Sequence, residues 1–188
     1  MEIKTLEIAG LGAALTALRL PFGREVRSQL ETKYNIVQVL GTDGWIDSEE
    51  ELPSYEITIA AKDYALMQTL IKRGDEHAKV LRGIVVWAKI KAPIYAWCEL
   101  ETYRAGHERL CSESTMHIDC QGLSGDELVK AKREISMGKE LTKIDLFSYQ
   151  CLRNIYRQRK DHRLPEWHEF CRWIKTLPFA NELITIGL

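Results

Sequence analysis

Basic side chains crowd one short stretch of the sequence, residues 148–163, which reads "SYQCLRNIYRQRKDHR". The stretch holds four arginines and one lysine against a single acid, Asp161. Guanidinium groups form paired hydrogen bonds to phosphate and carboxylate oxygens. The stretch is therefore a candidate for binding a phosphorylated small molecule or a nucleic acid.

Helical spacing divides these basic residues into two groups. Arg153, Arg157 and Lys160 lie at i, i+4 and i+7, which on a helix places them on one solvated stripe. Arg159 lies off that stripe, so its side chain is free to face a cleft. We predict a surface stripe beside one arginine that binds a ligand.

Several common kinds of catalytic site are missing from the sequence. It contains neither the G-x-S-x-G pattern of a nucleophilic serine nor the G-x-G-x-x-G pattern of a Rossmann dinucleotide site. His107, Cys111, His117 and Cys120 suggest a zinc site, but their spacing matches no strong zinc template. We predict no metal, and chemistry that a bound cofactor supplies.

Composition is typical of a single domain spanning residues 1–188. The 27 acids and 26 bases leave a net charge of -1, so any charge that binds a ligand must be local. Five scattered cysteines favour reduced thiols and a cytoplasmic protein. The N-terminus lacks the features of a signal peptide, and no apolar run reaches the roughly 20 residues of a membrane span.

The first half of the chain mixes predicted strands and helices. β-Branched residues and partial alternation predict strands at 35–41 and 54–61, and apolar spacing predicts a helix at 62–74. The clearest strand is "GIVVWAKIKAP", residues 83–93.

The second half is predicted to be mostly helical. We expect helices at 94–110, at 124–136 with Ser124 and Glu127 as a capping box, at 146–160 with Asp145 as its cap, and at 165–177 beginning at Pro165. The last of these has an apolar face for the core or a subunit contact, formed by Trp167, Phe170, Trp173 and Ile174. Strands early and helices late, without regular alternation, predict an α+β fold.

Three stretches, taken in order, resemble a known family. They are "KAPIYAWCELETYRAGHERLCSESTMH" at 91–117, "AKREISMGKELT" at 131–142, and "LRNIYRQRKDHRLPEW" at 152–167. Their order and spacing are similar to those of flavin-dependent thymidylate synthases, whose signature is R-H-R-x-x-S-x-N/S-E/Q-x-S. The resemblance covers roughly residues 84–170.

The resemblance implies two sets of binding residues. For the flavin it implies Arg104, His107, Arg109 and Asn154, where Arg104 and Arg109 are alternatives for one motif position, counted from Pro93 or back from Ser112. For the nucleotide it implies Glu99, Ser112, Ser114, Arg133 and Arg159, with Arg159 also as the catalytic candidate.

Three positions depart from the family motif. Thr115 stands for its Glu or Gln, His117 for its second serine, and Asp119 for an arginine. An acid repels a phosphate that an arginine attracts. The departures indicate a lost activity or an altered nucleotide specificity.

The resemblance implies a thymidylate synthase-complementing protein-like fold with a central, mostly antiparallel sheet and flanking helices. It implies a homotetramer with FAD at a subunit interface, where NADPH reduces FAD and methylenetetrahydrofolate supplies one carbon to C5 of a pyrimidine nucleotide. One alternative is a catalytically inactive relative. The other is a non-enzymatic nucleic-acid-binding domain that uses the basic helix with Tyr156 and Trp167 for stacking.

Overall fold

The computed structural model describes residues 1–23, 29–30, 57–58 and 60–188. The strand predicted at 35–41 lies outside these ranges. Of the strand predicted at 54–61, the structure describes β3 (Ile57–Thr58), which pairs antiparallel with β2 (Gln29–Leu30), and residues 60–61, where the prediction is wrong because Ala61 begins a helix. Among the described residues, no helix is long and apolar enough to cross a membrane.

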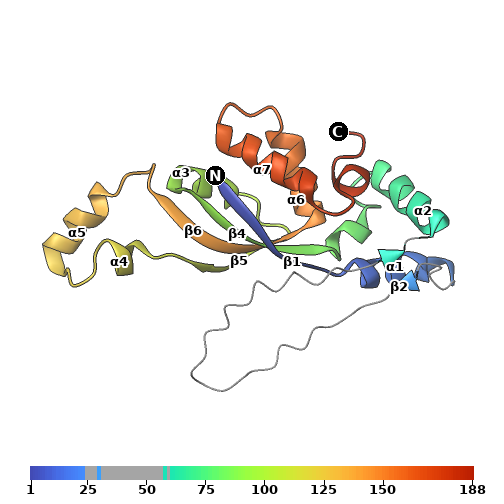
Figure 1. The fold of residues 1–188 in the computed structure, drawn as a ribbon, viewed down its shortest axis with the longest axis horizontal. Helices are drawn as coiled ribbons and strands as arrows, with labels where there is room; N and C mark the ends of the chain where they lie inside the picture. Colours follow the sequence, from blue (N-terminus) through green and yellow to red (C-terminus); the bar gives the residue numbers. More distant parts are fainter. Residues whose placement is uncertain (24–28, 31–56, 59) are drawn as a thin grey trace, which may run out of the picture.

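The main sheet has four antiparallel strands in the order β1-β4-β6-β5 (Figure 1). The strands are β1 (Glu2–Ala9), β4 (Val85–Pro93), β5 (His107–Ser112) and β6 (Glu140–Ser148). With its flanking helices this sheet confirms the predicted α+β class and its antiparallel arrangement. The predicted strand at 83–93 matches β4.

Two long helices, α6 (Tyr149–Arg159) and α7 (Pro165–Thr176), cover one face of the sheet (Figure 1). The predicted apolar face of α7 is confirmed, because Trp167, Phe170 and Ile174 are fully buried. Phe147 of β6 packs edge-to-face on Phe170, with ring centroids 5.7 Å apart. The short helix α3 (Ile94–Leu100) and the π-helical turn η3 (Ala180–Ile184) complete this layer.

Helices α1 (Leu11–Arg19) and α2 (Ala61–Lys72) lie at one end of the sheet with the 3-10 turns η1 (Leu20–Phe22) and η2 (Lys79–Arg82) (Figure 1). α2 corresponds to the predicted helix at 62–74. An ion pair of 2.6 Å between Arg19 and the fully buried Asp63 joins α1 to α2.

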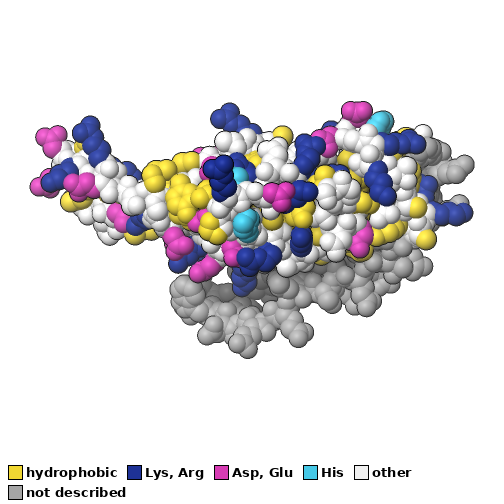
Figure 2. Space-filling view, turned by 90° about the horizontal axis from the view of Figure 1, so that it is seen from above, with side chains coloured by type: hydrophobic (Ala, Val, Ile, Leu, Met, Phe, Trp, Pro, Cys, Tyr) yellow, Lys and Arg dark blue, Asp and Glu magenta, His cyan; other side chains and the backbone are white. Residues whose placement is uncertain are grey.

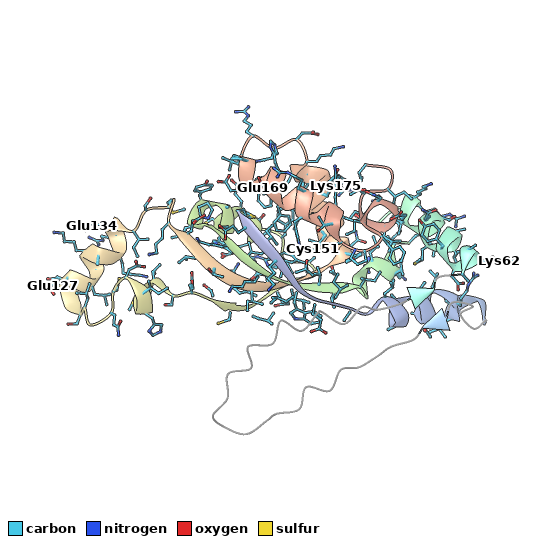
Figure 3. The ribbon with its side chains drawn as sticks, viewed as in Figure 1. Lys62, Glu127, Glu134, Cys151, Glu169 and Lys175 are labelled. Carbon is cyan, nitrogen blue, oxygen red and sulfur yellow. The ribbon has the colours of Figure 1, made fainter. Side chains whose placement is uncertain are left out.

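At the other end, α4 (Thr115–Ile118) and α5 (Gly125–Glu134) project from the sheet as an extension, the α4–α5 arm, residues 114–138 (Figures 1 and 3). Neither helix contains a buried residue. Ser124 precedes α5 as predicted, but its side chain makes no capping hydrogen bond. The arm exposes the apolar side chains of Met116, Ile118, Leu123, Val129 and Met137.

The predicted helix at 94–110 is wrong beyond Leu100. The chain turns at Gly106, whose φ of 77° is left-handed, and enters β5 at His107. A side chain at position 106 would place its Cβ 2.2 Å from Ser148 Oγ, so the turn requires glycine. Pairing with β6 thus overrides helix propensity here, and it turns Arg109 into a strand residue.

The predicted cap of α6 is also wrong. Asp145 lies within β6, which continues to Ser148. Ser148 is the N-cap of α6, and its Oγ accepts a hydrogen bond of 3.1 Å from the backbone N–H of Cys151. One serine therefore ends the strand and starts the helix.

Candidate functional site

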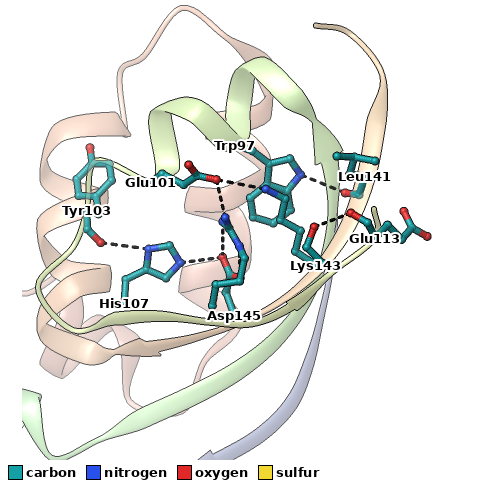
Figure 4. Close-up of polar contacts among 10 residues, drawn as sticks. Trp97, Glu101, Tyr103, His107, Glu113, Leu141, Lys143 and Asp145 are labelled. Atoms are coloured by element: carbon teal, nitrogen blue, oxygen red, sulfur yellow. Dashed lines mark hydrogen bonds and ion pairs between the residues drawn. The ribbon is translucent and has the colours of Figure 1, made fainter. Parts of the chain in front are cut away.

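Five ionisable side chains meet on the helix-covered face of the sheet at β5 and β6 (Figure 4). We call this group the sheet network; it comprises Glu101, His107, Arg109, Lys143 and Asp145. Asp145 is fully buried and Lys143 is 8% exposed. Buried charges are costly unless they are paired, so the group must hold together as a unit.

Asp145 is the hub of the sheet network. Its Oδ2 lies 2.7 Å from His107 Nε2, and its Oδ1 accepts a bond of 3.2 Å from Arg109 Nε. His107 Nδ1 faces the backbone carbonyl of Tyr103 at 3.1 Å. Both ring nitrogens of His107 therefore face acceptors, which fixes the orientation of the ring.

Glu101 closes the outer side of the sheet network. Its Oε1 accepts from Arg109 Nη1 at 2.5 Å and from Lys143 Nζ at 3.3 Å. The hydrogen bond from Arg109 lowers the pKa of Glu101. Trp97 lies beneath both cations, with Lys143 Nζ 4.5 Å and Arg109 Cζ 5.2 Å from its ring centroid.

The two cations of the sheet network respond differently to burial. Burial alone would lower the pKa of Arg109, but its bonds to Glu101 and Asp145 outweigh burial and raise that pKa. Burial, with the nearby charge of Arg109, lowers the pKa of Lys143. Lys143 is therefore the less well compensated cation.

A second group, the helix network, lies where α3, α6 and α7 meet and comprises Glu99, Tyr103, Arg159, His162 and Trp167. Arg159 donates from Nη1 to Glu99 Oε2 at 2.7 Å and from Nε to the Tyr103 hydroxyl at 2.8 Å. Trp167 Nε1 donates to the same Glu99 oxygen at 2.9 Å. The guanidinium stacks over Trp167, with Cζ 4.4 Å from the ring centroid.

Tyr103 connects the two networks. Its backbone carbonyl accepts from His107, and its hydroxyl accepts from Arg159. The orientation of Arg159 thus depends on a turn that Asp145 fixes through His107.

Two buried acceptor atoms on α6 have no hydrogen-bond partner among the described residues. They are Gln150 Oε1 and Asn154 Oδ1, which lie one helical turn apart on the same face. The amide nitrogen of Gln150 donates to Asp75 Oδ1 at 3.1 Å, which fixes the orientation of that side chain. An unpaired buried polar atom costs about 1–3 kcal/mol, so this face of α6 is suited to donors from a ligand.

The structure brings together some of the predicted site residues. Glu99 and Arg159 meet in the helix network, His107 and Arg109 meet in the sheet network, and Asn154 carries one of the unpaired acceptors. The other predicted residues lie elsewhere: Arg104 in the exposed turn after α3, Ser112 at the end of β5, Ser114 before α4, and Arg133 exposed on α5.

The serines and the departing motif residues make local contacts. Ser112 Oγ donates to the carbonyl of Glu113 at 2.6 Å, and Ser114 Oγ caps α4 by accepting from Met116 N–H at 3.2 Å. Thr115 accepts from Lys132, and Asp119 pairs with Lys139. Asp119, where the family motif has an arginine, therefore pairs with the lysine that directly follows the arm.

The predicted basic stripe is wrong for Arg153. Its guanidinium is half-buried and donates to the carbonyls of Ile184 and Ile186 at 2.6 and 2.9 Å, while Arg157 and Lys160 are exposed. Figure 2 shows basic and acidic side chains interspersed over the face drawn there. Tyr156 and Trp167, the candidates for base stacking, are buried.

The sequence motifs did not identify several polar residues of the two networks, namely Glu101, Lys143, Asp145 and His162, nor Gln150 on α6. A signal for two of them exists in the sequence. Lys143 and Asp145 stand at every second position between the apolar Leu141 and Phe147, so on a strand all four share one face, which is buried. Among the described residues, no three His, Cys, Asp or Glu side chains are placed to hold a metal ion.

The chain is similar to known proteins in its structure. No family model matches the sequence, and no curated protein sequence matches it. Two similar solved structures are the flavin-dependent thymidylate synthase ThyX of Helicobacter pylori, each in complex with FAD and dUMP. Each has a TM-score of 0.63 and 13% sequence identity, and the match covers 98% of this chain and 97% of that one.

The chain has the fold of flavin-dependent thymidylate synthases. The match extends over nearly the whole of both chains, so it includes the sheet, the covering helices and the arm. At 13% identity, the likeness shows the fold alone.

Proposed function

We propose that the protein binds FAD and a pyrimidine nucleotide and catalyses one-carbon transfer to C5 of the base, as a thymidylate synthase-like methyltransferase. The observation that carries this proposal is the end-to-end match in fold to an enzyme crystallised with FAD and dUMP. Methylenetetrahydrofolate as carbon donor and NADPH as reductant belong to the proposal.

The residues of α6 fit a flavin. A flavin pyrimidine edge carries an N–H donor, and Asn154 Oδ1 and Gln150 Oε1 are buried acceptors without a partner among the described residues. We propose that Asn154 holds the flavin together with His107, Arg109 or Arg104. FAD, when bound, supplies the hydride chemistry, so the chain needs no nucleophile of its own.

Arg159 is the residue that we propose contacts the nucleotide. Glu99 and Tyr103 hold two of its nitrogens, and Trp167 supports its flat face. A guanidinium fixed in this way can stabilise negative charge that develops on a pyrimidine carbonyl, without reorganising during the reaction.

The site is completed between copies of the chain in this proposal. Ser112, Ser114 and Arg133 lie on β5 and the α4–α5 arm, away from the helices that carry Arg159 (Figure 1). The arm exposes apolar side chains and buries none of its helical residues within the chain. We propose that a homotetramer brings the arm of one copy to the helix network of another.

Purified protein supplied with FAD, NADPH, methylenetetrahydrofolate and dUMP tests the activity. The expected result is a product 14 mass units heavier than dUMP (the mass of one CH2), detected by mass spectrometry, about one per NADPH oxidised. Parallel reactions with other pyrimidine nucleotides test whether the departures at Thr115, His117 and Asp119 alter specificity. FAD binding without NADPH oxidation would instead indicate an inactive relative.

A further inference from the structure

The outer half of the sheet network has the form of an anion site that the chain fills with its own carboxylate. One oxygen of Glu101 accepts from both Arg109 Nη1, at 2.5 Å, and Lys143 Nζ, at 3.3 Å. Two cations that converge on one oxygen form the donor set that phosphate oxygens prefer. We propose that Arg109 and Lys143 form a phosphate-binding site in which Glu101 takes the place of the ligand.

Buried residues beneath the site orient its two donors. Arg109 is held by the fully buried Asp145, through Nε at 3.2 Å and Nη2 at 3.4 Å, so its Nη1 is directed at Glu101. Lys143 rises from β6 with 9% of its side chain exposed, and its Nζ lies over the ring of Trp97. Arg109 is therefore oriented independently of Glu101, and Lys143 is confined by burial and by its contact with Trp97.

Glu101 is the most exposed member of this arrangement. It follows the last turn of α3, and 48% of its side chain is exposed, against 27% for Arg109. A phosphate that replaces it keeps the buried Lys143 paired, so the half-exposed carboxylate of Glu101 can turn into solvent. Its departure uncovers Arg109 Nη1 and Lys143 Nζ toward the opening that Glu101 occupied.

The charge balance favours a phosphate group over Glu101. With Glu101 turned away, Arg109 and Lys143 face one carboxylate, Asp145, which also pairs with His107. Lys143 Nζ makes one hydrogen bond among the described residues, to Glu101. A phosphate presents several acceptor oxygens, so it can bond both cations and satisfy further N–H donors of Lys143.

Inorganic pyrophosphate tests this site without reference to flavin or nucleotide, and calorimetric titration at low ionic strength measures its affinity. Glu101→Gln removes the competing charge, and we expect about tenfold tighter binding, a change that corresponds to one charge-assisted hydrogen bond at the lower end of its range. Lys143→Met keeps the side-chain volume and should weaken binding at least tenfold. The matched control is Glu108→Gln. It makes the same charge change at an exposed position of β5, directly before Arg109 in the sequence.

Pairs of ligands with and without a phosphate group identify which ligand the site holds. If Lys143→Met weakens FAD but not riboflavin, the site holds the flavin's phosphates; if it weakens dUMP but not deoxyuridine, the site holds the nucleotide's phosphate. An effect on pyrophosphate alone indicates another phosphorylated ligand. Equal pyrophosphate affinities for Glu101→Gln and Glu108→Gln, or an unchanged affinity in Lys143→Met, would overturn the proposal even if FAD binds.

Discussion

The sheet network and the helix network contain similar side chains but differ in what they leave open. In the sheet network, both oxygens of the fully buried Asp145 are paired, and Glu101 closes the outer side. In the helix network, Glu99 Oε1 and Arg159 Nη2 have no hydrogen bond within the described part of the chain. The cations of the sheet network are covered by Glu101 and meet a ligand only when Glu101 turns away, whereas the helix network keeps a donor and an acceptor open.

The largest effect should come from removing the hub of the sheet network. Asp145→Asn leaves the charge of Arg109 without its buried partner and removes the carboxylate that His107 contacts, and we expect a loss of about 3 kcal/mol or more in the free energy of unfolding. Urea denaturation measures this loss. Glu169→Gln, which removes the exposed partner of Arg172, is the control and should have a much smaller effect; equal losses would contradict the comparison.

The helix network should respond in ligand affinity. Arg159→Ala should weaken dUMP binding about tenfold or more, because a charge-assisted contact contributes about 1.5–3 kcal/mol. The affinity is measured by titrating dUMP into the FAD-loaded protein. Arg157→Ala removes an exposed arginine of the same helix and should leave the affinity unchanged. If both variants bind alike, the stretch 148–163 is a basic helix without a role in nucleotide binding.

Ser148 joins the two networks, since it ends the strand that carries Asp145 and caps the helix that carries Arg159. Ser148→Ala should lower the free energy of unfolding by about 1 kcal/mol through loss of the cap. Ser124 stands at the same place before α5 and makes no capping bond. Thermal unfolding should therefore show a clear loss for Ser148→Ala and little for Ser124→Ala; the reverse order would contradict the assigned caps.

The smallest effect concerns pH. The bond from Arg109 holds the pKa of Glu101 in the folded chain below the 4.5 of an unperturbed side chain. This contribution is present above about pH 4.5 and is lost as pH falls through the lowered pKa. Because Glu101 is half exposed, the loss should be under about 1 kcal/mol. Stability measured between pH 3 and 6 should fall less steeply toward low pH in Glu101→Gln than in the wild type; identical slopes would contradict the pairing.

The same contrast explains how much could be predicted from sequence. The apolar spacing of α7 and the β-branched run of β4 follow local rules, and both elements were predicted. β6 was not predicted, because Lys143 and Asp145 stand at core positions and break the alternation that identifies a half-buried strand. The two residues that prevented its prediction belong to the sheet network. Local sequence rules are expected to fail where residues serve a site and not the fold.

The site was predicted in part, for a related reason. Motif order led to Glu99 and Arg159, which the fold places 2.7 Å apart although they lie 60 residues apart in sequence. The predicted helix at 94–110 included Arg109, and sheet pairing instead places it on β5 beside Asp145. Long-range pairing of this kind leaves no local pattern in the sequence.

The most direct test of the proposed function is the absorbance spectrum of the FAD-loaded protein before and after dUMP is added. Binding of both molecules at one site predicts a yellow protein whose flavin band near 450 nm shifts on adding dUMP, and a shift that Arg159→Ala loses and Arg157→Ala keeps. A colourless protein that neither takes up FAD nor gains thermal stability with it would contradict the proposal.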